Sequence, residues 1–284
     1  MTALRELRSL GNSVVLRWTV AALGLVLVLS VTQELARPET TDLISSGTAE
    51  ATLRRAVPIL LAGLGGIWAE RAGVVNIGLE GMMILGAWFG AWGALEFGPW
   101  WGIVIGIAGG AAGGLLHAVA TVGFGVDHII SGVAINIIAV GAVQYLAALT
   151  FVGLPGGGQT QSPKLDNVGS ITIGPLSDAL GEVEEQDIFF VSELAAVARA
   201  LVTNLSLLVV LAFVLLVLTY WVLWRTSFGL RLRSTGESPS AAESLGVAVL
   251  RYKFVAVLIS GALGGIAAYV GAALSAAQPN LPTG

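Results

Sequence analysis

The chain has 284 residues, of which 55% are hydrophobic and only 11% are charged, and its formal net charge is −4. A soluble domain carries about 25% charged residues. A mean hydropathy of +0.85 leaves too little polar surface to cover one water-soluble core. This composition excludes an ordinary cytosolic enzyme and a disordered chain, and the acidic balance argues against a nucleic-acid partner. The absence of cysteine excludes disulfides and thiolate metal sites. The sequence predicts an all-α, polytopic membrane bundle.

Seven apolar segments are predicted to cross the membrane, because a helix needs about 20 apolar residues to span the hydrocarbon core. The second segment is short and contains Pro58 and three glycines, which predicts a broken helix. In chain order the segments are Trp18–Leu35, Ala56–Ala69, Ala72–Leu95, Trp100–Phe124, Ile129–Val152, Leu201–Trp224 and Phe254–Ala277.

The distribution of charge predicts the orientation of these spans. Residues 225–253 carry five Lys or Arg residues, which places this segment in the cytoplasm by the positive-inside rule. Residues 153–199 are mostly acidic and are predicted to form an extracellular loop region. Counting back through the spans places the N-terminus in the cytoplasm. The whole chain, residues 1–284, is predicted to form one transmembrane domain.

Glycine recurs every fourth residue in the fourth predicted span, at Gly102, Gly106, Gly110 and Gly114. The third span has Gly86 and Gly90 at this spacing, and the seventh has Gly261 and Gly265. Such a stripe lets another helix approach closely. It predicts tight helix packing, and it also suits a surface that slides during a conformational change.

Four polar side chains within the predicted third and fifth spans are candidates for a solute path: Asn76, Glu80, Asn136 and Gln144. If the third helix starts at Ala72, Glu80 lies about 12 Å along it. An ionised group there requires a partner, such as Arg71, or a wet cavity. Asn136 and Gln144 of the fifth span could serve only to make interhelical hydrogen bonds. Two uncharged amides in one helix nevertheless favour a neutral, hydrogen-bonding solute over an ion. Asp127 is predicted to cap the fifth helix.

Several motifs for chemistry are missing from the sequence. It contains no G-x-x-x-x-G-K-[ST] phosphate loop, no H-E-x-x-H metal motif and no G-x-S-x-G elbow. With only His117 and His128, a metal centre of several histidines is not expected. The chain is therefore predicted to be no enzyme and to carry no cofactor or metal of its own.

Two motifs resemble a known family. The segment Glu70–Ala87, ERAGVVNIGLEGMMILGA, is similar to a signature of the permease subunits of ABC importers for nucleosides and simple sugars. That group also includes branched-chain amino acid permeases. The second match is Thr226–Gly246, TSFGLRLRSTGESPSAAESLG, followed by the glycine-rich Ser260–Gly265. The resemblance covers roughly residues 53–284.

The resemblance implies a channel-forming subunit in a prokaryotic cell membrane, driven by Mg-ATP hydrolysis on a separate ATPase. The implied partners are that ATPase, a second permease subunit and a solute-binding protein that meets the extracellular loop. Residues 225–253 then form a coupling loop, in which Ser238 and Pro239 begin a short helix that docks on the ATPase. The coupling residues carried over from the motif are Phe228, Gly229, Arg231, Arg233, Gly236, Glu237, Pro239, Ala241, Ala242 and Gly246.

Three alternatives stay open at the level of sequence. The substrate class could be branched-chain amino acids, or the protein could be an ion-coupled secondary transporter that uses Glu80. An intramembrane enzyme or structural subunit is the third, although no nucleophile–base pair can be placed. Family members usually continue with further helices after a stretch like Pro279–Gly284, so the chain is expected to be C-terminally truncated.

Overall fold

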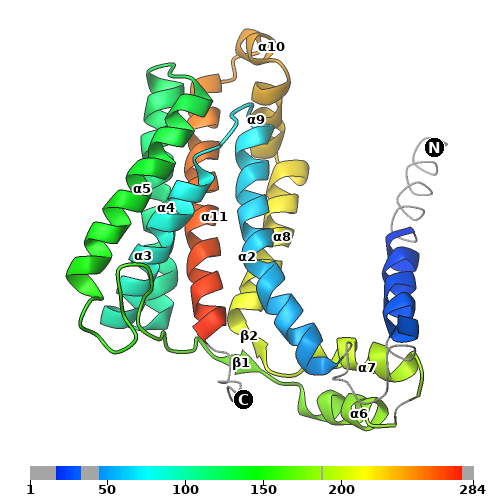
Figure 1. Ribbon diagram of the computed structural model, residues 1–284. Helices are drawn as coiled ribbons and strands as arrows, with labels where there is room; N and C mark the ends of the chain where they lie inside the picture. Colours follow the sequence, from blue (N-terminus) through cyan, green and yellow to red (C-terminus); the bar gives the residue numbers. More distant parts are fainter. Residues whose placement is uncertain (1–16, 33–44, 187, 277–284) are drawn as a thin grey trace, which may run out of the picture. The chain divides into compact units, whose positions relative to one another are not determined.

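The structure is a computed structural model that describes residues 17–32, 45–186 and 188–276 (Figure 1). Helices dominate these residues, with one two-stranded pairing of β1 (Ser170–Ile171) and β2 (Leu205–Ser206). The first described helix is Arg17–Thr32. The others are α2 (Ser46–Arg71), α3 (Leu79–Phe97), α4 (Pro99–Ala118), the π-helical η1 (Val119–Gly123), α5 (His128–Thr150), α6 (Gly174–Glu184), α7 (Val191–Ala200), α8 (Leu207–Arg225), α9 (Ser227–Glu237), α10 (Pro239–Ser244) and α11 (Val249–Ala276).

The chain divides into two compact units. One comprises residues 1–53 and 170–205, and the other comprises residues 54–169 and 206–284. The second unit holds α3, α4, α5, α8, α9, α10 and α11, together with most of α2. The candidate site lies entirely within this second unit.

The structure confirms a membrane-type helical fold but not the predicted count of seven spans. Among the described residues, four helical segments are long and apolar enough to cross a bilayer: Pro99–Gly123, His128–Thr150, Leu207–Arg225 and Val249–Ala276. The apolar helix Arg17–Thr32 has fewer than the 18 residues required here of a membrane span. The fourth and fifth predicted spans match their helices within a few residues.

Three predicted spans differ from the observed helices. The sixth begins at Leu207 rather than Leu201. The second is not a short broken segment, because α2 runs for 26 residues with Pro58 inside it. The third does not begin at Ala72, because residues 72–78 leave the helix and α3 starts only at Leu79. Glu80 therefore lies in the first turn of α3 rather than deep within a helix, and its side chain is exposed.

The core of the second unit is a close crossing of α3, α4 and α11, where the predicted glycine stripes meet. A Cβ at Gly110 would lie 2.6 Å from Gly265 Cα, and a Cβ at Gly261 would lie 2.9 Å from Gly114 Cα. At Gly86 a Cβ would overlap the backbone of Gly265. The helices pack backbone against backbone, as the small-residue spacing predicts.

Tyr269 of α11 fills the space that two of these glycines leave. Its side chain is fully buried, and a Cβ at Gly90 or Gly102 would lie within 2.7 Å of its ring. Its hydroxyl donates a hydrogen bond to the backbone oxygen of Pro99 at 2.7 Å. The buried phenol therefore has its polar group satisfied while its ring locks α11 against α3 and α4.

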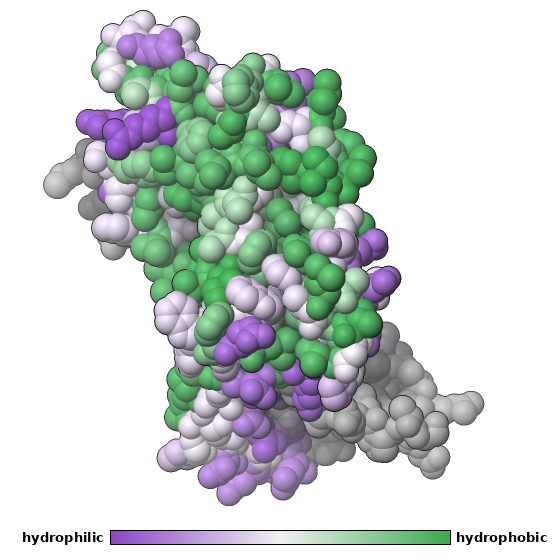
Figure 2. Space-filling view, turned by 90° about the vertical axis from the view of Figure 1, so that its left-hand side faces the viewer, coloured by the Kyte–Doolittle hydropathy of each residue, from purple (hydrophilic) through white to green (hydrophobic). Residues whose placement is uncertain are grey.

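The outer face of α5 is broadly apolar. Ile130, Ile137, Ile138 and Leu149 each expose more than 60% of their surface, and Figure 2 shows a wide hydrophobic band with hydrophilic residues toward both ends. Water-soluble proteins rarely expose so large an apolar patch. This surface suits contact with lipid tails or with another membrane-embedded chain.

The predicted extracellular loop, residues 153–199, contains the helices α6 and α7. In the first unit, the guanidinium of Arg199 donates to the Glu184 carboxylate at 2.8 Å, and the backbone N–H of Ser46 donates to the same carboxylate at 3.0 Å. Partial burial raises the pKa of Glu184, but these hydrogen bonds outweigh it and hold that pKa below its ordinary value.

Candidate functional site

A cavity of about 1240 Å³ lies in the second unit. The loop after α5, which lines part of it, lies at the end of the bundle opposite α10 (Figure 1). Four elements line the cavity: α3, α5, the last turns of α11 and the loop that follows α5. Its lining residues are Ile84, Ala87, Trp88, Ala91, Val140, Val143, Gln144, Ala147, Phe151, Gly156, Gln159, Thr160, Gln161, Ser162, Pro163, Lys164, Ala272, Ser275 and Ala276.

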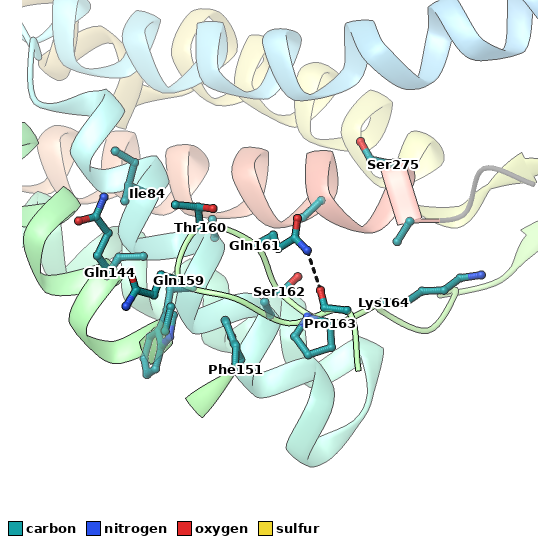
Figure 3. A pocket seen from close by; sticks show the side chains of 18 of the residues that line it. Ile84, Gln144, Phe151, Gln159, Thr160, Gln161, Ser162, Pro163, Lys164 and Ser275 are labelled. Atoms are coloured by element: carbon teal, nitrogen blue, oxygen red, sulfur yellow. Dashed lines mark hydrogen bonds between the residues drawn. The ribbon is translucent and has the colours of Figure 1, made fainter. Parts of the chain in front are cut away.

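The loop after α5 folds back along the cavity and is held in place by its own contacts. The side-chain amide of Gln161 donates to the backbone oxygen of Gly156 at 3.0 Å, and the N–H of Gly158 donates to the backbone oxygen of Gln161 at 3.0 Å. Leu165 and Val168 are buried and anchor the loop's far end. In Figure 3, Gln144 and Gln159 lie toward one end of the cavity, and Lys164 and Ser275 lie toward the other.

The lining combines neutral polar groups with apolar and aromatic side chains. Amides and hydroxyls come from Gln144, Gln159, Thr160, Gln161, Ser162 and Ser275. Trp88 and Phe151 contribute aromatic rings, with their centroids 6.3 Å apart. Lys164 is the one charged residue in the lining. Such a cavity suits an uncharged solute that has an apolar body and several hydrogen-bonding groups.

Of the four predicted path residues, the structure places only Gln144 in this cavity. Asn136 instead holds the start of α3 to α5, because its Oδ1 accepts from Gly81 N–H at 2.7 Å and its Nδ2 donates to the backbone oxygen of Ile77 at 3.1 Å. It thereby satisfies two backbone groups at the non-helical segment 72–78, called the break below, that would otherwise lack helical partners.

Asn76 lies within the break and joins it to α11. Its Nδ2 donates to Ser260 Oγ at 2.8 Å. The backbone N–H of Val75 donates to His128 Nδ1 at 3.3 Å, which ties the break to the start of α5 as well. Glu80 makes no ion pair with Arg71 in the structure, since Arg71 lies over the ring of Trp224 instead. The break is thus a fastened junction rather than a stretch that lines the cavity.

The cap predicted for α5 is confirmed. Asp127 Oδ1 accepts from the N–H of Ile129 at 2.8 Å and of Ile130 at 3.2 Å. At the coupling loop, Ser238 and Pro239 do begin α10, as predicted, but Ser238 makes no side-chain capping bond there. Thr226 caps α9 instead, and its Oγ1 accepts from Gly229 N–H at 3.1 Å.

The residues expected to contact an ATPase fall into buried and exposed sets. Gly229 and Ala242 are buried, while Phe228, Arg233 and Gly236 are half-buried in packing between α9 and its neighbours. Arg231, Glu237, Pro239, Ala241 and Gly246 are exposed. Leu245 is not among the individual coupling residues carried over from the motif; it directly follows α10 and is 85% exposed. An apolar side chain this exposed at a helix end is a candidate docking contact.

The coupling loop touches the break directly. A Cβ at Gly73 would lie 3.0 Å from Gly236 Cα, and a Cβ at Gly236 would lie 2.5 Å from the backbone oxygen of Arg71. Gly73 also has a φ of +77°, which glycine adopts without strain. The two sequence motifs that carry the family resemblance therefore meet in space at the C-terminal end of α9.

The cavity loop was also missed by sequence analysis. Its run of neutral polar residues from Gln159 to Ser162, directly after three glycines, was the available signal. Trp88 and Phe151 gave no such signal, because aromatic residues are common throughout apolar spans.

These features define a membrane-embedded helical protein with a solute-sized cavity and a structured loop at the opposite end. The family model for the permease component of branched-chain amino acid transport systems matches residues 48–283. The chain belongs to this family.

Three curated relatives are similar to most of the chain. A guanosine ABC transporter permease of Bacillus subtilis is 38% identical over 76% of this chain and 64% of its own length. A nucleoside ABC transporter permease of Lactococcus lactis is 36% identical over 74% of this chain and 62% of its own. A putative glucose ABC transporter permease of Haloferax volcanii is 31% identical, with shares of 84% and 65%. The chain thus spans less than two thirds of each relative. No solved structure matches it.

Proposed function

We propose that this chain forms part of the solute path of an ATP-driven ABC importer, and that its solute is a nucleoside. The names of the guanosine and nucleoside permeases support this class. The single observation that carries it in this chain is the cavity lined by neutral amides, hydroxyls and aromatic rings. A nucleobase supplies a planar apolar ring with hydrogen-bonding edges, and a ribose supplies hydroxyls.

A simple sugar is the second candidate, favoured by the putative glucose permease and by the hydroxyl-rich cavity loop. Sugars and nucleosides make different demands on the cavity. A sugar needs mainly hydrogen-bonding groups, whereas a nucleobase also gains from apolar and aromatic contact. Trp88, Phe151 and Ala147 therefore favour the nucleoside.

In this proposal Mg-ATP binds and is hydrolysed on a separate ATPase subunit, and this chain carries no cofactor. A second permease subunit completes the channel, and a solute-binding protein delivers the solute on the side of the acidic residues 153–199. The basic loop 225–253 and the N-terminus face the cytoplasm, in keeping with the positive-inside rule. With α10 in the cytoplasm, the cavity opens toward the outside, where an importer receives its solute.

The contacts within the second unit suggest how ATP hydrolysis would reach the cavity. The ATPase contacts α10 and Leu245, and α10 follows α9 directly. The end of α9 contacts the break at Gly73, and the break leads into α3, which lines the cavity. A shift of α10 would thus be passed to α3 through packed backbone rather than through flexible side chains, and it would favour one of two cavity states.

Uptake by the full-length protein, co-expressed with its ATPase and binding protein, tests the solute class. We expect uptake of radiolabelled guanosine or uridine, competition by other nucleosides, and little competition by glucose. Gln144→Leu should raise KM by up to about tenfold, because one hydrogen bond to the solute contributes about 1.4 kcal/mol or less. The control is Tyr145→Phe, since Tyr145 is 67% exposed and lies outside the cavity lining. Glucose uptake without nucleoside uptake would overturn the proposed solute.

The energy source has its own test. Leu245→Ser should abolish ATPase co-purification and uptake, whereas Leu245→Met should preserve both. Because Leu245 is 85% exposed, neither change disturbs the core. Uptake that persists with a hydrolysis-deficient ATPase, but collapses when ion gradients are removed, would instead support the secondary transporter.

A further inference from the structure

Two arginines lie over one tryptophan at the coupling-loop end of the second unit. The guanidinium carbon of Arg71 is 5.7 Å from the ring centroid of Trp224, and that of Arg233 is 5.8 Å away. The three residues come from the end of α2, the last turn of α8 and the middle of α9. Both distances are within the range of cation–π attraction.

The two arginines have no acidic partner among the residues that the structure describes. Among the described residues, neither guanidinium forms an ion pair, and Nε of Arg233 is buried without a hydrogen-bond partner. The contact of Gly73 with Gly236 brings α2 and α9 together and so holds both cations near one ring. Two like charges that lie near one ring repel each other, and an anion bound next to them would relieve that repulsion.

Trp224 also ends an exposed apolar stripe on α8. Phe213, Val217, Trp221 and Trp224 follow one another at helical spacing and are 42%, 65%, 55% and 39% exposed. The opposite face of α8 packs on α2, where Trp68 Nε1 donates to Thr219 Oγ1 at 3.3 Å. An exposed apolar stripe that ends in tryptophan and arginine is the pattern of a helix leaving a bilayer at its headgroup layer.

We propose that Arg71, Arg233 and Trp224 form a binding site for the phosphate of an anionic phospholipid. The acyl chains lie along the stripe of α8, and the two guanidiniums contact the headgroup phosphate, which accepts paired hydrogen bonds from their planar forks. The continuity of the cluster with the stripe favours a lipid over an acidic side chain of a protein partner. This site depends on membrane insertion and not on which solute is carried.

Native mass spectrometry of the full-length protein with its ATPase, reconstituted in phosphatidylcholine nanodiscs with or without phosphatidylglycerol, tests this site. Wild type should retain phosphatidylglycerol and gain thermal stability from it. The double variant Arg71→Gln/Arg233→Gln should bind it roughly 100-fold more weakly, about tenfold for each guanidinium whose hydrogen bonds to the phosphate are lost. The matched control, Arg251→Gln/Lys253→Gln, removes the same charge from α11 and should behave like wild type.

Each other outcome would overturn the proposal. Equal retention in all variants would show that Trp224 marks no lipid site, and equal loss in the control would show general charge attraction. Stabilisation by inorganic phosphate in phosphatidylcholine alone would assign the site to free phosphate. A loss of ATPase affinity confined to the Arg71/Arg233 variant, without a lipid effect, would assign it to a carboxylate of the ATPase. Arg71→Lys/Arg233→Lys keeps the charge but not the planar forks, so it should bind the lipid more weakly than wild type and more tightly than the glutamine variant, and this intermediate affinity guards against simple misfolding.

Discussion

The crossing of α3, α4 and α11 predicts that Gly265→Ala is strongly destabilising. The added methyl would overlap the backbone oxygen of Gly106 and would lie 2.9 Å from both Cα and N of Gly110. All three obstacles are backbone atoms, so no side chain can rotate to make room. The helices would have to separate along the whole crossing.

The loss of stability expected for Gly265→Ala follows from this separation of the helices. Overpacking a close-packed core costs about 1–3 kcal/mol. We expect the upper end of this range, because a gap of about 0.5–1 Å already removes a quarter to a half of the dispersion energy of each contact. In a bilayer such packing is a main source of helix association, since lipid tails are as apolar as the side chains.

The assay is thermal unfolding of the purified protein in nanodiscs, followed by tryptophan fluorescence. The matched control is Gly66→Ala, because Gly66 is also within a helix but has no atom within 4 Å of an added Cβ. We expect Gly265→Ala to lower Tm by several degrees and Gly66→Ala to leave it unchanged or raise it slightly. Equal Tm values for Gly265→Ala and wild type would refute the close backbone crossing.

Three smaller predictions concern single contacts. Asp127→Ala should cost about 1 kcal/mol and increase hydrogen exchange at the start of α5, whereas Asp127→Asn should preserve the cap. Because the pKa of Glu184 is held below its ordinary value, its contact with Arg199 should stabilise α6 and α7 above that ordinary pKa and should be lost as pH falls through the lowered one. Hydrogen exchange of α7 against pH would measure this loss, and a Glu184→Gln variant that kept the same pH dependence would contradict it. Thr219→Val should lower the free energy of unfolding by about 0.6 kcal/mol because it removes one hydrogen bond, and Trp68→Phe should cost more because it also leaves a cavity at a buried position. In thermal unfolding, the double variant should cost less than the sum of the two.

Much of the architecture depends on residues that are close in sequence, and it could therefore be predicted from the sequence. The four-residue glycine spacing predicted the helix crossing, and the position of Asp127 before an apolar run predicted the cap of α5. Pro239 after Ser238 predicted the start of α10. Each of these depends on contacts within a turn or on a period that one helix sets by itself. The low charge and the long apolar runs likewise predicted a membrane protein, because hydrophobicity is a property of each segment by itself.

The roles of the polar residues were decided by the tertiary structure. Asn136 meets Ile77, which is 59 residues away in the chain, and Asn76 meets Ser260 across 184 residues. An amide within a span can line a path or satisfy a broken helix, and only its neighbours in space distinguish the two. The meeting of Gly73 with Gly236, and of Arg71 and Arg233 over Trp224, likewise depends on how α2, α8 and α9 pack. Sequence alone determined which segments are apolar helices, because that preference is a property of each segment, whereas the cavity and the junction arise only where segments distant in sequence touch.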